Sequence, residues 1–141
     1  MRFWDASAVV PLLVAERPTV VVRRLLRADA GMAVWALAPL EVLSALWRRQ
    51  RAADLDPREQ AAAEQALHAL EQAWSVIGDL DVVERRARRL LATHPLRAAD
   101  AAQLAAALVA CDERPELLPF VTLDDRLGDA ARREGFAVLP A

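Results

Sequence analysis

Short apolar runs alternate with longer segments of helical periodicity along this 141-residue chain, and this alternation constrains the fold most strongly. Runs typical of strands cover residues 2–5, 32–36, 74–77, 118–122 and 136–139. Strands that are separated by helices pair in parallel through right-handed crossovers, and helices then cover both faces of the sheet. The sequence therefore predicts one α/β domain over residues 1–141, a three-layer α/β/α sandwich around a central, mainly parallel sheet.

Residues with strong end preferences predict where the helices begin and stop. The expected helices cover residues 8–15, 18–30, 39–51, 57–73, 81–91, 98–110 and 125–134. Ser7 is the expected N-cap of the first helix, and Asp56 with Glu59 has the spacing of a capping box. Gly31 and Gly135 are the expected C-terminal stops of two helices, because glycine readily adopts the left-handed backbone found there.

Composition excludes several classes of mechanism. All 18 basic residues are arginine, which excludes chemistry that requires a lysine ammonium, such as phosphate-loop and Schiff-base mechanisms. The single cysteine, Cys111, cannot form an internal disulfide, and no apolar run approaches the roughly 20 residues of a membrane span. We therefore expect a cytoplasmic protein without a membrane segment. Its net charge of −2 means that a local basic patch must hold any polyanionic partner.

Four acidic residues lie where the sheet and its helices are expected to form a binding edge. Asp5 and Asp124 close two predicted strands, whereas Glu41 and Asp100 lie in the first turns of two predicted helices. Ligands of open α/β sheets bind at the carboxyl ends of the strands, so these acids are expected to share one rim. Clustered carboxylates repel each other unless a cation is present, and Mg²⁺ and Mn²⁺ prefer carboxylate oxygens. The pattern predicts a site for metal-assisted attack on a phosphodiester.

Some of these acids also have a purely structural interpretation. Asp5 can cap the helix that follows it, and Glu41 is a favourable acid near a helix N-terminus. Asp100 is harder to explain in this way, because an acid in an otherwise apolar, alanine-rich helix costs burial energy. The functional interpretation therefore depends on the four acids taken together.

Four segments of the chain resemble, in order, the motifs of PIN-domain ribonucleases, especially the VapC-type toxins of bacterial toxin–antitoxin modules. The segments are FWDASAVV at residues 3–10, LEVLSAL at 40–46, LRAADAAQLAAA at 96–107 and FVTLDDRL at 120–127. One such motif alone is weak. Four motifs in the expected order over nearly the whole chain make the resemblance specific.

The resemblance implies roles for individual residues. The metal-binding and catalytic acids that it implies are Asp5, Glu41, Asp100 and Asp124. Ser7 and Thr122 match hydroxyl positions that support the site or contact phosphate. Of the two adjacent acids, the Thr-x-Asp pattern selects Asp124, which leaves Asp125 as the expected N-cap of the helix that follows. Gln103 stands where relatives carry varied residues, so we assign it no catalytic role.

The resemblance also implies an activity and its partners. It implies an endoribonuclease that depends on Mg²⁺ or Mn²⁺ and hydrolyses RNA to leave a 5′ phosphate. As a VapC-like toxin, the protein would be silenced by a cognate antitoxin, a small protein whose C-terminal segment enters the acidic groove. The family further suggests a homodimer, for which the apolar helices over residues 20–26 and 40–47 are candidate interfaces.

Two alternatives stay open from the sequence. A non-toxin PIN nuclease that processes RNA or acts on DNA would keep the same acids, and a non-catalytic PIN-like interaction module would have no reason to keep all four. Arginine clusters at residues 23–27, 48–51, 85–89 and 132–133 are either solvated helix faces or, for one or two of them, holders of RNA phosphates. An acidic pocket repels RNA by itself, so a basic rim is required if RNA is the substrate.

Overall fold

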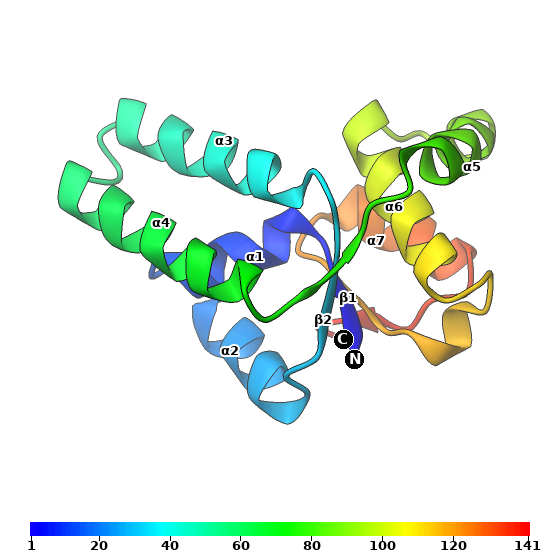
Figure 1. The fold of residues 1–141 in the computed structure, drawn as a ribbon, viewed down its shortest axis with the longest axis horizontal. Helices are drawn as coiled ribbons and strands as arrows, with labels where there is room; N and C mark the ends of the chain where they lie inside the picture. The colour runs from blue at the N-terminus through cyan, green and yellow to red at the C-terminus, as the bar shows by residue number, and fades with distance from the viewer.

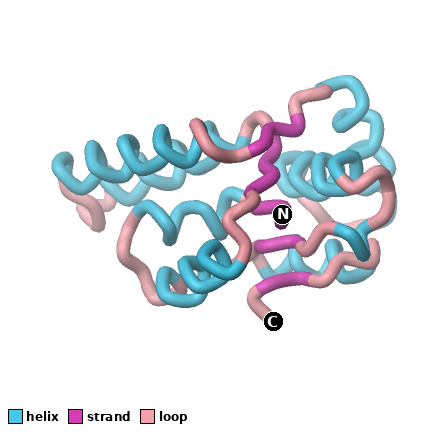
Figure 2. Tube along the Cα trace, turned by 60° about the horizontal axis from the view of Figure 1, so that its bottom comes forward, coloured by secondary structure: helices cyan, strands magenta, loops and turns pink.

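A computed structural model describes all residues from Met1 to Ala141 and contains one five-stranded sheet in which every pair of neighbouring strands is parallel. The strands lie in the order β3-β2-β1-β4-β5. Their bounds are Arg2–Trp4 for β1, Met32–Trp35 for β2, Ser75–Ile77 for β3, Phe120–Val121 for β4 and Val138–Leu139 for β5. Helices flank the sheet on both sides (Figure 2), which confirms the predicted α/β/α architecture.

The strand order places a topological switch point beside β1. The chain runs outward from β1 through β2 to β3, and then returns to pair β4 with the other edge of β1. Phe3 of β1 therefore pairs with both Ala33 of β2 and Phe120 of β4. In such sheets the crevice at the carboxyl ends of the strands, where the order reverses, is the usual ligand site. Asp5 and Asp124 follow the two strands that meet there.

Helices bury a separate apolar core against each face of the sheet. On one face lie α1 (Ala6–Leu13), α2 (Thr19–Ala28), α3 (Ala38–Arg51) and α4 (Pro57–Glu71), and on the other lie α5 (Leu80–Thr93), α6 (Ala98–Ala110) and α7 (Asp125–Arg133), as Figure 1 shows. Side chains alternate along a strand, so Phe3 and Trp4, both fully buried, enter different cores. None of the helices combines the length and hydropathy that a membrane crossing requires.

Several helix ends follow their sequence signals. The capping box is confirmed at the start of α4, where Glu59 N donates to Asp56 Oδ1 at 2.8 Å and Asp56 N donates to Glu59 Oε1 at 3.1 Å. Gly135 is also confirmed as a C-terminal stop, because its φ of +102° lies in the region that glycine favours. A short 3₁₀ helix, η1 (Pro115–Leu117), packs next to it.

Three predicted helix ends are wrong. Helix α1 begins at Ala6, and its N-cap is Asp5 rather than Ser7. Helix α7 is capped by Asp124, whose Oδ1 accepts from Leu127 N at 3.0 Å, so Asp125 is not the N-cap. Helix α2 stops at Ala28 with an extended residue as its C-cap, and Gly31 lies beyond that end. At the starts of α1 and α7, the acid nearer the preceding strand accepts the hydrogen bond from a free backbone N–H group.

Candidate active site

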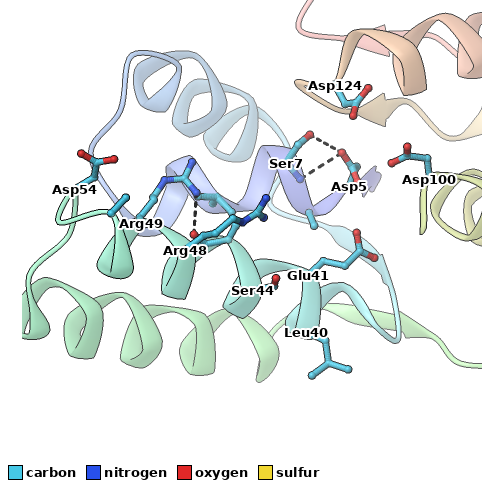
Figure 3. Close-up of a pocket in the computed structure, with 14 residues that line it drawn as sticks. Asp5, Ser7, Leu40, Glu41, Ser44, Arg48, Arg49, Asp54, Asp100 and Asp124 are labelled. Carbon is cyan, nitrogen blue, oxygen red and sulfur yellow. Dashed lines mark hydrogen bonds between the residues drawn. The ribbon is translucent and has the colours of Figure 1, made fainter. Parts of the chain in front are cut away.

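One cavity of about 810 Å³ opens at the carboxyl ends of the central strands, and all four predicted acids line it. Those acids are Asp5, Glu41, Asp100 and Asp124, which come from four separate segments of the chain (Figure 3). The cavity continues from this acidic end along α3 to Arg48 and Arg49. The structure therefore brings the predicted site residues to one place, although up to 119 positions separate them along the chain.

Each acid lies at the N-terminal end of a helix. Asp5 and Asp124 are the N-caps of α1 and α7, whereas Glu41 and Asp100 lie in the first turns of α3 and α6. Free backbone N–H groups and the helix dipole place partial positive charge at these ends. The helix starts therefore favour ionised carboxylates at the cavity, and they do so without a basic side chain in the cluster.

Asp5 is the most tightly held of the four. The residue is 4% exposed, and its Oδ2 accepts hydrogen bonds from Ser7 Oγ at 2.5 Å and from Thr122 Oγ1 at 2.9 Å. The backbone N–H of Ser7 also donates to Oδ2, at 3.3 Å. Every hydrogen bond to this carboxylate goes to Oδ2, so Oδ1 stays available to a ligand.

Ser7 and Thr122 join Asp5 to the segment that carries Asp124. Leu123 N donates to Ser7 Oγ at 2.9 Å, and Asp124 N donates to Thr122 Oγ1 at 3.1 Å. The two hydroxyls thus lock the end of β1 to the end of β4 across the switch point. Thr122 is buried, so its hydroxyl serves Asp5 and the backbone rather than a ligand in the cavity.

Three acids of the cavity have a raised pKa. Burial raises the pKa of Asp5 to about 6, although the hydrogen bonds from Ser7 and Thr122 oppose the rise. Burial and then repulsion from Asp5 raise the pKa of Glu41 to about 7. Burial and repulsion from Asp124 also raise the pKa of Asp100. These repulsions connect all four acids into one electrostatic group, which a cation would stabilise.

Gln103 contacts this group, although no catalytic role is predicted for it from the sequence. Its side chain is fully buried in α6, and its Nε2 donates to Glu41 Oε1 at 3.0 Å, which lowers the pKa of that acid. The signal in the sequence is the same one that singled out Asp100, a polar residue in an otherwise apolar helix. Gln103 lies one turn after Asp100, so both face the same side of α6.

Only the first of the two adjacent acids after β4 lines the cavity. Asp124 lines it, whereas Asp125 is exposed and lies outside it. This placement agrees with the choice of Asp124 from the Thr-x-Asp pattern. Neither histidine lies at the cavity, since His94 Nε2 lies 3.0 Å from Glu134 Oε1 and the His68 side chain is exposed.

The donor set fits a hard divalent cation. It offers carboxylate oxygens only, and Asp5 and Glu41 each have one oxygen held by a hydrogen bond and the other free of one. No three acidic, histidine or cysteine side chains form a ready-made ligand cluster in the chain. Mg²⁺ needs no such cluster, because one or two carboxylates usually hold it and water and phosphate complete its octahedron.

The chain matches known proteins over nearly its full length. A sequence model of the PIN domain matches residues 2–133. Two relatives from Mycobacterium tuberculosis strains, Ribonuclease VapC45 and Ribonuclease VapC49, are each 35% identical over 142 residues, covering 99% of this chain and 94% of the relative.

Solved structures share the same fold. Mycobacterium tuberculosis VapC20, described as a sarcin–ricin loop cleaving toxin, superposes with a TM-score of 0.70 and 20% identity, covering 96% of both chains. A chain of a toxin–antitoxin complex from Klebsiella pneumoniae superposes with a TM-score of 0.63 and 17% identity, covering 88% of this chain and 87% of that one. The resemblance predicted from the four motifs is confirmed: the chain belongs to the PIN-domain family and is similar to its VapC-type members.

Proposed function

We propose that this protein is a metal-dependent endoribonuclease, the VapC-like toxin of a toxin–antitoxin module, and that residues 1–141 form its nuclease domain. The observation that carries the proposal is the cavity lined by four carboxylates, none of which forms an ion pair within the chain. Mutual repulsion among unpaired acids that are buried or half-buried costs free energy, and such clusters persist where a cation is bound for function. The similarity to Ribonuclease VapC45 supports RNA as the substrate.

The four acids Asp5, Glu41, Asp100 and Asp124 would hold Mg²⁺ or Mn²⁺. When bound, the ion polarises the scissile phosphodiester and lowers the pKa of a water at the site. Asp5 is fixed by two hydroxyl donors and Glu41 by the Gln103 amide, so the free oxygens of both acids are held in place before a ligand arrives. Such pre-organisation avoids reordering the site during the reaction.

The partners follow from the same site. A protein that cleaves cellular RNA would act in the cytoplasm. The acidic cavity could accept a basic side chain from the C-terminal segment of an antitoxin, which would then act as an inhibitor. The similarity in fold to a chain of a toxin–antitoxin complex is compatible with such a partner. A homodimer would cover the apolar side chains of Val20, Leu40 and Trp47, which are 66%, 64% and 41% exposed.

A cleavage assay tests the proposal. The purified chain should cut single-stranded RNA in the presence of Mn²⁺, and chelation by EDTA should abolish cleavage. Asp5→Asn and Asp100→Asn should each lower the cleavage rate by about a hundredfold or more, because each removes a carboxylate from the metal site. Parallel reactions on single-stranded DNA and on total RNA separate a toxin-like ribonuclease from a nuclease that acts on DNA.

The adjacent acids provide a matched control. Asp124→Asn should lose cleavage while keeping the helix, because asparagine caps a helix about as well as aspartate. Asp125→Asn removes the same charge one residue away, outside the cavity, and should cleave like the unchanged protein. Cleavage that survives Asp5→Asn and Asp100→Asn, or that needs no divalent cation, contradicts the mechanism.

A further inference from the structure

We propose that Arg48 forms a phosphate-binding subsite for single-stranded RNA, separate from the metal-binding acids, and this inference rests on the proposed ribonuclease function. Arg48 lines the same cavity as the acids and lies on the same face of α3 as Glu41 and Ser44 (Figure 3). Seven residues separate Glu41 from Arg48, which corresponds to about 10 Å along a helix axis. A strand whose scissile phosphate lies at the acids therefore presents a flanking phosphate to Arg48.

Arg48 differs from its neighbour in having no partner within the chain. Each nitrogen of the Arg49 guanidinium has a partner within the chain: its Nη2 and Nε lie 2.6 and 2.7 Å from Glu16 Oε1, and its Nη1 donates to Ala45 O at 3.2 Å. Arg48 is exposed and forms no ion pair or hydrogen bond. The N–H donors of its planar guanidinium are therefore free to form two parallel hydrogen bonds to the oxygens of a phosphate.

The charge distribution of the cavity favours this assignment. Its acidic end repels RNA, so binding requires positive charge that the strand meets outside the cluster. Arg97 and Arg126 lie near Asp100 and lower its pKa, so their charge acts at the acidic end itself. At the other end Glu16 balances the charge of Arg49, and the exposed Asp54 forms no ion pair. Arg48 is therefore the one arginine of the cavity wall without an acidic partner.

The remaining arginine clusters are less suitable. The clusters over residues 23–27, 85–89 and 132–133 do not line the acidic cavity. Arg86 is paired with Glu113, Arg88 with Glu84, and Arg132 lies 3.2 Å from an acid on its own helix. These clusters fit the interpretation of solvated helix faces. Of the four arginine clusters in the sequence, the structure supports the one on α3 as the holder of RNA.

Binding of a short, fluorescein-labelled single-stranded RNA of mixed sequence tests the subsite. The full chain carries Asp100→Asn so that the probe is not cut, and anisotropy is measured with Mn²⁺ between about 50 and 200 mM salt. Adding Arg48→Gln should weaken binding roughly tenfold and reduce the slope of log K against log salt by about 0.7, the value for one lost contact to a single strand. Arg48→Lys should restore the slope but only part of the affinity, because lysine keeps the positive charge but cannot form two parallel hydrogen bonds to one phosphate.

The controls separate this inference from the function on which it rests. Arg24→Gln removes the same charge from the exposed face of α2, away from the cavity, and should bind the probe like the parent. If Arg48→Gln binds with unchanged affinity or with an unchanged salt slope while the wild-type chain cleaves RNA, only the Arg48 assignment is overturned. If the parent binds no RNA and the wild-type chain cleaves none, the ribonuclease proposal is overturned as well.

Discussion

Replacing Asp5 by asparagine should stabilise the metal-free protein at neutral pH while abolishing its activity. The reason is the buried charge. In the folded chain the pKa of Asp5 is raised from 3.8 to about 6, chiefly by burial. Ionising this carboxylate at neutral pH therefore costs folding free energy that a neutral amide does not cost. Stability and catalysis should respond to this one substitution in opposite directions.

The size of the effect follows from the pKa shift. A rise from 3.8 to about 6 corresponds to about 3 kcal/mol at 1.36 kcal/mol for each pKa unit. Between those two pH values the folded state binds more protons than the unfolded state, so the stability of the wild-type chain falls as pH rises through this window. Asparagine does not titrate. The variant should therefore match the wild-type chain only below about pH 3 and exceed it by up to about 3 kcal/mol above about pH 7.

Asparagine preserves most of the local structure. It caps helices about as well as aspartate, so the start of α1 is kept. Its carbonyl oxygen can accept from the hydroxyls of Ser7 and Thr122, which both donate to a single oxygen of Asp5. Because these bonds become weaker with a neutral acceptor, the gain of about 3 kcal/mol is an upper bound.

Urea unfolding in EDTA, at several values between about pH 4 and pH 8, measures the effect. Asp54→Asn is the matched control: Asp54 lines the same cavity but is exposed, so its loss should change the free energy of unfolding by less than about 0.5 kcal/mol. Adding Mn²⁺ above pH 7 should stabilise the wild-type chain more than the variant and narrow the gap. A variant that is destabilised at high pH, or whose effect does not change with pH, would refute the assignment of a costly buried charge.

Three further substitutions test other parts of the structure. Gln103→Leu removes the donor to Glu41 and should weaken Mn²⁺ binding, measured by calorimetry, by about tenfold. Gln60→Leu should raise the free energy of unfolding by about 1 kcal/mol, because both amide atoms of this buried side chain lack a partner. Gly135→Ala should lower it by about 1 kcal/mol or more, since φ is +102° and the new methyl would lie 3.0 Å from Pro115 Cγ.

These predictions share internal controls. Gln60→Leu is chemically the same change as Gln103→Leu but lies in α4, so it should leave Mn²⁺ affinity unchanged. Equal Mn²⁺ affinities for the two variants would mean that Gln103 does not position Glu41. An unchanged unfolding midpoint for Gly135→Ala in urea would mean that the chain relaxes at that turn without cost.

The arrangement of the site could be predicted because topology restricts it. Once the strands are known to be parallel, every residue that closes a strand lies at the same edge of the sheet, which brings Asp5 and Asp124 together. Glu41 and Asp100 follow from the starts of helices that leave that edge. These inferences need the identity and order of the elements, which periodicity indicates well, and the ends of the elements only to within a few residues.

The caps of α1 and α7 are harder to predict than that of α4, because neighbouring residues compete for the same role. Asp5 and Ser7 both have cap-forming side chains, as do Asp124 and Asp125. Ser7 and Asp125 are the expected caps, and capping by Asp5 is only the structural alternative to a role in the site. In the structure a single carboxylate serves both purposes, because Asp124 directs Oδ1 to the N-terminus of α7 and still lines the cavity. The cap fixes the direction of the acid, so structural and functional interpretations of the residue are compatible.

The contact between Gln103 and Glu41 could not be predicted from local sequence patterns, because 62 positions separate the two residues. A buried amide in an apolar helix indicates only that some partner exists. The partner depends on how α6 packs against the strand β2 and on the turn that leads from β2 into α3.

The hydrogen bond from Gln103 to Glu41 has a chemical consequence as well as a structural one. The hydrogen bonds to Asp5 and Glu41 lower pKa values that burial raises, so they keep the acids closer to the ionised state that a divalent cation requires. The cavity thus combines burial, which raises the pKa of its acids, with a few donors that hold the acids in place and limit the cost of their charge.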